Sequence, residues 1–182
     1  MKNKNSEWNV VDLLSHSRHD WMNKLQLIKG NLSLQKFDRV HEIIEEVIIE
    51  SQQESKLCNL KMSAFASYLM TFNWKQHHFQ LEYEILGDVL SLEEYDMAVS
   101  QWTKSLLETI DQLAEITHDN HLMITIDIGS NEDEVRFFFD FNGIIKETET
   151  LISWLSKHHE KINVKEFEVN TYEVAIVVSL GT

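Results

Sequence analysis

The sequence predicts an α+β protein in two parts, an N-terminal helical hairpin and a C-terminal domain of strands and helices. Apolar residues recur at helical spacing through the first sixty residues, whereas several later segments alternate apolar and polar residues as half-buried strands do. The charge divides at the same place. Residues 1–60 carry eight Lys/Arg and nine Asp/Glu, and residues 61–182 carry eight and twenty-one. We therefore predict one domain at 1–60 and a second at 61–182.

The N-terminal part predicts two helices joined by a turn. Leu14, Trp21, Leu25, Ile28 and Leu32 follow a heptad pattern that is interrupted by Arg18, and a second apolar stripe includes Val40, Ile43, Ile44, Val47 and Ile48. The turn is placed either at Gly30–Asn31 or at Lys36–Asp38. Because the first pattern continues through Leu32, we favour the later turn, with Asp38 as the N-cap of the second helix.

Two helices alone cannot bury both apolar stripes. Pairing two hairpins about a two-fold axis buries them in a four-helix bundle, so we expect a homodimer. The alternative is that the hairpin packs on its own C-terminal domain.

The C-terminal part predicts a mainly antiparallel sheet with helices on one face. Expected helices are 62–77, with Phe65, Leu69 and Phe72 on one face, 92–117 and 149–159. Expected strands are 79–86, 121–128, 134–141, 164–169 and 172–180, with hairpin turns at 129–133 and 170–171.

Composition excludes several classes of function. The chain has 182 residues, a formal net charge of −14, one Cys, five Gly and no Pro. The negative charge argues against nucleic acid or an anionic membrane as the main partner. A single Cys excludes an intrachain disulfide framework and fits a reducing, cytoplasmic location. No apolar run is long enough to span a membrane, and the first ten residues do not form a signal peptide.

The first helix carries the residues with the most reactive chemistry. His19 follows a residue of the apolar stripe, so its imidazole is expected on the outer surface of the bundle, where it can act as a nucleophile near neutral pH. Asp20 is placed to orient the ring or accept its proton. Asn23 is placed on the same face to hydrogen-bond a phosphoryl group, and Arg18 and Lys24 to compensate its charge.

Other features of the sequence have simpler interpretations. The spacings His16/His19 and His118/His121 each allow two metal ligands, but neither offers a third, so we expect no metal site. Arg18 occupies a position in the apolar stripe, where an unpaired charge is costly, and we predict that it contacts Glu54. The alternative is that its guanidinium reaches solvent.

The segment His16–Gln35, together with Glu54–Leu57 and Leu69–Leu86, resembles the sporulation initiation phosphotransferase B family. This resemblance implies a homodimeric four-helix bundle and C-terminal domains related to histidine-kinase ATPase domains. It implies that His19 takes a phosphoryl group from the aspartate of one response regulator and passes it to a second that controls sporulation. Each regulator would bring its own Mg²⁺, and this chain would bind no cofactor. Docking is expected on the first helix, at Arg18, Met22, Lys24, Gln26 and Lys29.

The C-terminal domain departs from a true histidine kinase, in which an Asn-bearing helix and an Asp-x-Gly-x-Gly loop hold the nucleotide. Thr109 or a neighbour occupies the position of that Asn. The loop position reads Phe139–Ile144, which keeps Asp140 but only one displaced glycine, Gly143. We therefore predict a degenerate ATPase-like domain that binds no ATP.

Two other functions remain possible from the sequence. One is a non-enzymatic dimeric adaptor that binds a response regulator, and the other is the output domain of a sensor kinase. The missing Asn and glycines argue against the second.

Overall fold

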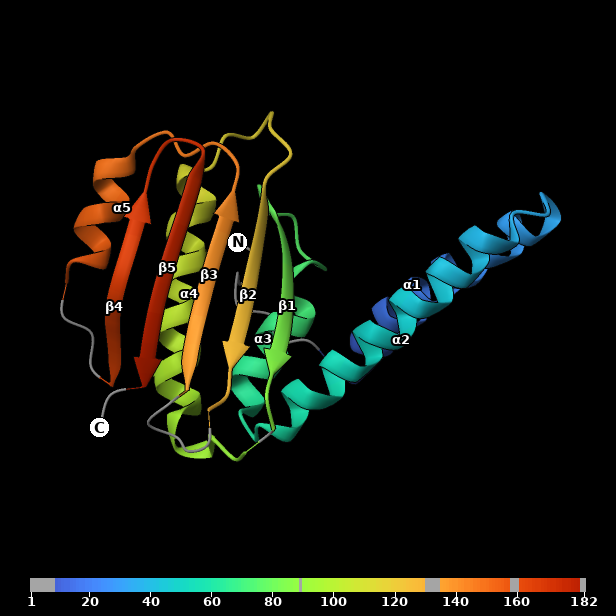
Figure 1. Cartoon of the computed structure of the whole chain (residues 1–182), viewed down its shortest axis with the longest axis horizontal. Helices are drawn as coiled ribbons and strands as arrows, with labels where there is room; N and C mark the ends of the chain where they lie inside the picture. Colours follow the sequence, from blue (N-terminus) through green and yellow to red (C-terminus); the bar gives the residue numbers. More distant parts are fainter. Residues whose placement is uncertain (1–8, 89, 130–134, 158–160, 181–182) are drawn as a thin grey trace. The chain divides into compact units, whose positions relative to one another are not determined.

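The computed structural model describes residues 9–88, 90–129, 135–157 and 161–180. The chain separates into two compact units, Met1–Gln52 and Gln53–Thr182. Helix α1 (Val10–Ser33) and most of α2 (Phe37–Asn59) form the first unit, and the last turns of α2 belong to the second (Figure 1). Within the described residues, no helix is both long and apolar enough to cross a membrane.

The hairpin turn lies at 34–36, near the later of the two predicted positions, and Phe37 and Asp38 already belong to α2. Helix α1 continues through Gly30 and ends at Ser33, and Gln35 turns the chain with φ 55°. The prediction that Asp38 caps α2 is wrong. The amide of Val40 donates to the carbonyl of Lys36 at 3.1 Å, so helical bonding begins before Phe37 and Asp38 lies in the first turn.

The hairpin keeps most of its apolar stripe on the outside. Val40 and Ile43 of α2 are buried within the unit. The exposed apolar side chains include Leu14, Trp21, Leu25 and Leu32 of α1, with exposed fractions between 45% and 60%, and Ile44 and Ile48 of α2. A single hairpin therefore leaves uncovered the residues that the heptad pattern identifies as a packing surface.

The second unit contains three α-helices and five strands in its described residues. The helices are α3 (Ser63–Phe72), α4 (Asp96–Leu113), which follows the short 3₁₀ helix η1 (Glu93–Tyr95), and α5 (Thr148–Leu155). The strands are β1 (Gln80–Leu86), β2 (His121–Asp127), β3 (Arg136–Asn142), β4 (Ile162–Val169) and β5 (Glu173–Leu180). The predicted turn at 129–133 lies mostly outside the described residues.

The strands form one sheet in the order β1-β2-β3-β5-β4. Only β1 and β2 pair in parallel, because α4 carries the chain back between them, and the remaining pairs are antiparallel as predicted. The predicted helices at 62–77 and 92–117 are shorter than expected, since α3 ends at Phe72 and α4 at Leu113.

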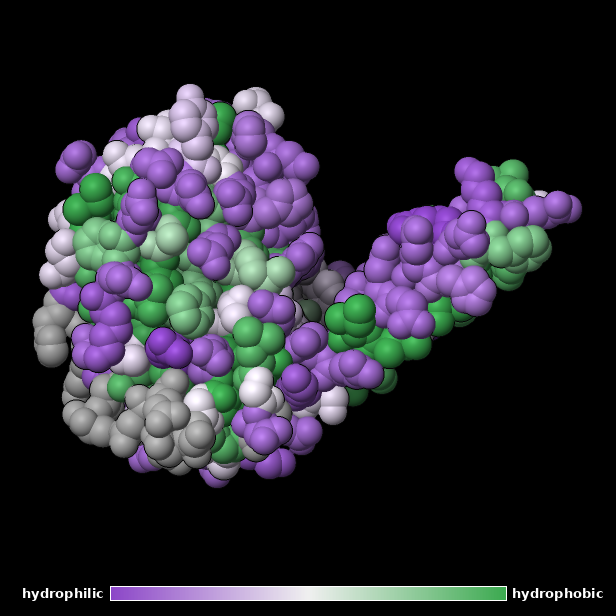
Figure 2. All heavy atoms as spheres, in the orientation of Figure 1, coloured by the Kyte–Doolittle hydropathy of each residue, from purple (hydrophilic) through white to green (hydrophobic). Residues whose placement is uncertain are grey.

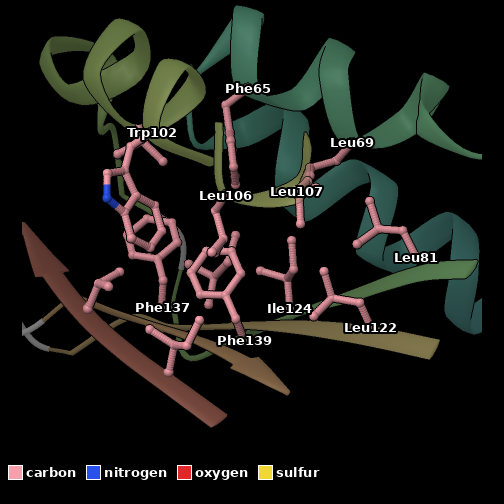
Figure 3. Packing of buried hydrophobic residues seen from close by; sticks show 14 of the residues in the cluster. Phe65, Leu69, Leu81, Trp102, Leu106, Leu107, Leu122, Ile124, Phe137 and Phe139 are labelled. Carbon is pink, nitrogen blue, oxygen red and sulfur yellow. The ribbon is translucent and has the colours of Figure 1, made fainter. Parts of the chain in front are cut away.

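The hydrophobic core lies between one face of the sheet and helices α3 and α4 (Figure 3), and Leu151 and Leu155 of α5 belong to the same buried cluster. Phe65 of α3 and Leu106 of α4 pack toward Phe137 and Phe139 of β3, and Leu69 of α3 lies on the side of Leu107 and Leu81. All of these residues are almost fully buried. The predicted apolar face of α3 is confirmed, because Phe65, Leu69 and Phe72 are buried together.

Two pairs of hydrogen bonds fix the helices of this domain in place. The Asp96 carboxylate at the start of α4 accepts hydrogen bonds from the amides of Ala64 and Phe65, each 2.9 Å long, and so caps α3. Gln53 and Lys56 hold the end of α2 on the edge strand β1, since they pair with the amide and carbonyl of Ile85.

Candidate functional site

His19 lies midway along α1, on a long regular helix that fixes the direction of its side chain. Its imidazole is largely exposed, with 72% of the side chain accessible to solvent. Nδ1 lies 3.4 Å from Oδ1 of Asp20 and 3.3 Å from Nδ2 of Asn23, which is one turn further along the helix. The structure therefore brings together the three residues predicted to carry the chemistry.

The geometry distinguishes the two ring nitrogens of His19. Both contacts that the described residues make with the ring involve Nδ1. This leaves Nε2 as the nitrogen that can meet an incoming group. A neutral imidazole held in this way has one nitrogen for a local hydrogen bond and the other for nucleophilic attack.

The predicted docking residues divide into two groups. Arg18, Met22, Gln26 and Lys29 are exposed on α1, as a surface for a partner requires. Lys24 differs, because its ammonium forms an ion pair with Glu50 of α2 and it is only half exposed. Lys24 also lies 6.0 Å from the centre of the Trp21 ring.

Sequence reasoning missed Glu50 as a neighbour of this helix. The signal was available, because antiparallel pairing of the two helices about a turn at 34–36 brings residue 24 level with about residue 46, and Glu50 lies one helical turn further along α2. The predicted Arg18–Glu54 contact stays a prediction, since the two residues belong to different units of the chain.

The sequence offers two pairs of histidines at metal-ligand spacing, His16/His19 and His118/His121, and predicts no third ligand for either pair. Across the residues that the structure describes, no group of three or more His, Cys, Asp or Glu side chains is arranged to hold a metal ion. His121 instead lies 3.3 Å from Asp119.

In the second unit, the residues at the expected nucleotide-binding positions make structural contacts. Thr109 donates its hydroxyl to the carbonyl of Ser105 in its own helix, at 2.8 Å. Gly143 packs directly against Asn120, and a Cβ at this position would overlap the Asn120 side chain, lying 2.8 Å from its Cβ. Asp140 alternates with core residues of β3 and so points away from the helices. Burial raises the pKa of the Asp140 carboxyl.

Asn120 explains why glycine is required at position 143. It is 2% exposed, and its amide donates to the carbonyls of His78 and Glu115, while its oxygen accepts from the amide of Ile144. All three hydrogen bonds lie between 2.8 and 2.9 Å. The single glycine of this loop therefore makes room for a buried side chain that ties three segments together.

Comparison with known proteins places both parts of the chain in one group. Residues 1–60 match the profile of the SpoOB-type sensor-kinase alpha-helical domain, and residues 61–181 match that of sporulation initiation phospho-transferase B, C-terminal. The sporulation initiation phosphotransferase B of Bacillus subtilis (strain 168) is 40% identical over 186 aligned positions, which cover 97% of each chain. This chain belongs to the sporulation initiation phosphotransferase B family.

The solved structures that match this chain include two histidine kinases, each at low similarity. The catalytic domain of histidine kinase ThkA matches with a TM-score of 0.45 and 12% identity, over 69% of this chain and 91% of the other. Acinetobacter baumannii histidine kinase AdeS matches with a TM-score of 0.38 and 9% identity, over 90% of this chain and 97% of the other. The assignment to the family rests on the sequence matches, which cover nearly the whole chain.

Membership of the family makes the chain a phosphotransferase with a role in sporulation.

Proposed function

We propose that this chain is a cytoplasmic relay phosphotransferase in which His19 carries the phosphoryl group. It would take that group from the aspartyl phosphate of one response regulator and pass it to the aspartate of a second, which controls sporulation. The observation that supports this most is an exposed imidazole, fixed on a helix, whose local contacts all involve Nδ1.

The first step of the proposal assigns the ring proton. The Asp20 carboxylate favours a proton on Nδ1, whereas an amide nitrogen of Asn23 at the same atom favours a lone pair there. A hydrogen bond to a charged acceptor is about twice as strong as a neutral one, so we assign the proton to Nδ1. The Asn23 amide then rotates to present its oxygen, and the lone pair is on Nε2.

The second step is an in-line transfer between nitrogen and oxygen. The Nε2 lone pair forms the N–P bond while the P–O bond of the aspartyl phosphate breaks, and the electron pair of that bond stays on the departing carboxylate. The positive charge that develops on the imidazole is stabilised by Asp20 through the Nδ1 proton. The reverse displacement, by the aspartate of the second regulator, returns the ring to its starting state.

The chain supplies few groups for this chemistry besides the imidazole. Asn23 can donate to a phosphoryl oxygen, and Arg18 can offset its charge. Lys24 is held by Glu50, so we assign it to the hairpin structure and to docking more than to the phosphoryl group. Mg²⁺ and a lysine would come with each regulator, in its own acidic pocket. The near-neutral charge of residues 1–60 supports approach of such a pocket, which the acidic second domain would repel.

A homodimer is part of this proposal. The apolar stripe of α1 and α2 is exposed in a single hairpin, and two copies related by a two-fold axis would bury it in a four-helix bundle. Substituting Leu25→Glu would place a charge in the middle of that interface and should yield monomers in sedimentation experiments. Gln26→Glu, on the docking face, should leave the dimer intact.

We also propose that the second domain no longer binds ATP. Support comes from Gly143, which packs on Asn120 where a nucleotide loop would need an open backbone, and from the acidic charge of residues 61–182. Calorimetric titration with ATP and Mg²⁺ should show no binding at micromolar concentrations. Such binding would favour the sensor-kinase alternative.

A phosphotransfer assay decides between an enzyme and an adaptor. A regulator labelled with ³²P on its aspartate is mixed with the full chain, and label is followed onto the chain and then onto a second regulator. His19→Ala should accept no label, whereas His16→Ala, one turn earlier on the same helix, should transfer normally. Label on the His19→Ala chain would refute the assignment, and binding without transfer by the unmodified chain would favour the adaptor.

A further inference from the structure

The outer face of the sheet in the second unit, which points away from the helices, carries a ring of acidic side chains. Side chains alternate between the two faces of a strand. In β1, β2, β3 and β5 the buried apolar residues point toward the helices, so the residues between them point to the outer face. On β4, the outward residues are those that pair with outward residues of β5, as Glu166 does with Val177 and Glu168 with Ala175. The outward carboxylates are Glu82, Glu84, Asp127, Asp140, Glu166, Glu168 and Glu173.

The middle of this face is apolar except for Asp140 of β3. Phe138 of β3 lies opposite Val177 of β5 in the register, and Met123 and Ala175 lie opposite Asp140 on its two sides. These four apolar residues are half-buried although they point away from the helices. Figure 2, in which the sheet faces the viewer, shows hydrophobic residues in the middle of the second unit with hydrophilic residues around them.

Cationic side chains are scarce on this face. At the outward strand positions that the structure describes, Arg136 is the only Lys or Arg, and its guanidinium donates to Asp127 at 3.1 Å and lies over the Phe138 ring. Lys165 sits at the β-bulge of β4. At the outward strand positions that the structure describes, seven carboxylates therefore face one Lys or Arg, and this face is strongly negative.

An apolar middle surrounded by carboxylates favours one class of binding partner. Within the described residues, the acidic groups do not gather into a metal site, and a nucleic acid would be repelled. A second copy of the chain meeting through this face would bring two acidic rings together. An apolar centre inside a negative ring instead matches a protein segment that carries apolar residues between Lys or Arg side chains.

We propose that the outer face of the sheet is a docking surface for a basic, amphipathic segment of a protein partner. Apolar side chains of the segment would cover Phe138, Val177 and Met123. A cation beside them would meet the Asp140 carboxylate, which lies between Met123 and Ala175 in the register of the sheet. This surface lies in the second unit and does not depend on His19, so the inference goes beyond the proposed phosphotransfer.

The test uses the full chain and a synthetic twelve-residue peptide of alternating Lys and Val, titrated by calorimetry at low and physiological salt. The face variant Asp140→Asn/Glu166→Gln/Glu168→Gln removes three charges from the ring. A matched variant, Glu93→Gln/Glu94→Gln/Glu149→Gln, removes three exposed charges from η1 and α5. We expect the face variant to bind about tenfold more weakly, and the matched variant to stay within about twofold of the unmodified chain.

A second arm tests the apolar centre. Phe138→Thr removes the aromatic ring but keeps a residue type that is common in strands. This variant should bind the Lys–Val peptide more weakly than the unmodified chain does. A Lys–Ser peptide, which lacks apolar side chains, should bind poorly to every variant. If Phe138→Thr unfolds, as a thermal melt would show, the pair of charge variants decides alone. Equal weakening by both charge variants would overturn the proposal, because net charge would then explain the binding. Loss of self-association in the face variant, measured by sedimentation, would also overturn it and assign the face to contact between copies.

Discussion

The contact between His19 and Asp20 allows the contribution of the carboxylate to be predicted as a number. Nδ1 and Oδ1 are 3.4 Å apart, which is long for a hydrogen bond, and the two side chains are 72% and 48% exposed. Exposed pairs of this kind contribute about 0–1 kcal/mol, and a tenfold change corresponds to about 1.4 kcal/mol. Asp20→Asn should therefore slow phosphoryl acceptance by His19 by about fivefold at most, whereas His19→Ala abolishes it.

The assay is a single-turnover transfer from a ³²P-labelled regulator to excess full-length chain, stopped at short times. Glu45→Gln, an exposed acid on α2, is the matched control for the loss of one charge and should leave the rate unchanged. A loss of about a hundredfold or more in Asp20→Asn would refute the reasoning. It would mean that the His19–Asp20 contact shortens and is shielded from water when the regulator docks. The contribution of Asp20 would then be larger than its exposure in the isolated chain indicates.

The remaining predictions concern the second unit. Asp96→Ala should lower the free energy of unfolding by about 2 kcal/mol in urea titrations, because two amides at the start of α3 lose a charged acceptor. Gly143→Ala should cost about 3 kcal/mol in the same titration, because the added methyl group displaces Asn120 and its hydrogen bonds. Asp140→Asn should raise the melting temperature near pH 7. Burial raises the folded-state pKa of Asp140, so its charged form opposes folding, and the benefit of Asn disappears as the pH falls through that pKa.

Each of these predictions has an outcome that contradicts it. Glu93→Ala serves as the control for Asp96→Ala, and equal destabilisation by both would show that α3 does not depend on its cap. A Gly143→Ala variant as stable as the parent would mean that Asn120 moves aside without loss. A difference between Asp140→Asn and the parent that persists unchanged to about pH 4 would exclude titration of this carboxyl as its cause.

Much of the hairpin follows from local pattern. The heptad positions of α1, with Leu32 as the last, favoured the later turn at Lys36–Asp38, and the structure places the turn slightly earlier, at 34–36. Asp38 shows the limit of such reasoning. Its residue type suits an N-cap, but the carbonyl of Lys36 already accepts a helical bond, and sequence patterns locate helix ends only to within about two to four residues.

The core of the second unit was also predictable, because burial imposes a period on each element. Phe65, Leu69 and Phe72 repeat at helical spacing, and Phe137, Phe139 and Phe141 alternate along one strand. The parallel pairing of β1 with β2 was not foreseen. It depends on where α4 returns the chain, and strand alternation alone carries no information on direction.

For the site, the sequence by itself determined that His19, Asp20 and Asn23 share one region of a helix, because helical geometry fixes neighbours at short separations. Only the tertiary structure decided what residues far apart in the chain do. It pairs Lys24 with Glu50, places Asn120 against Gly143, and gathers carboxylates from five strands on one face of the sheet. Such contacts depend on the register between elements, which is set by packing of the whole domain, and local spacing cannot specify it.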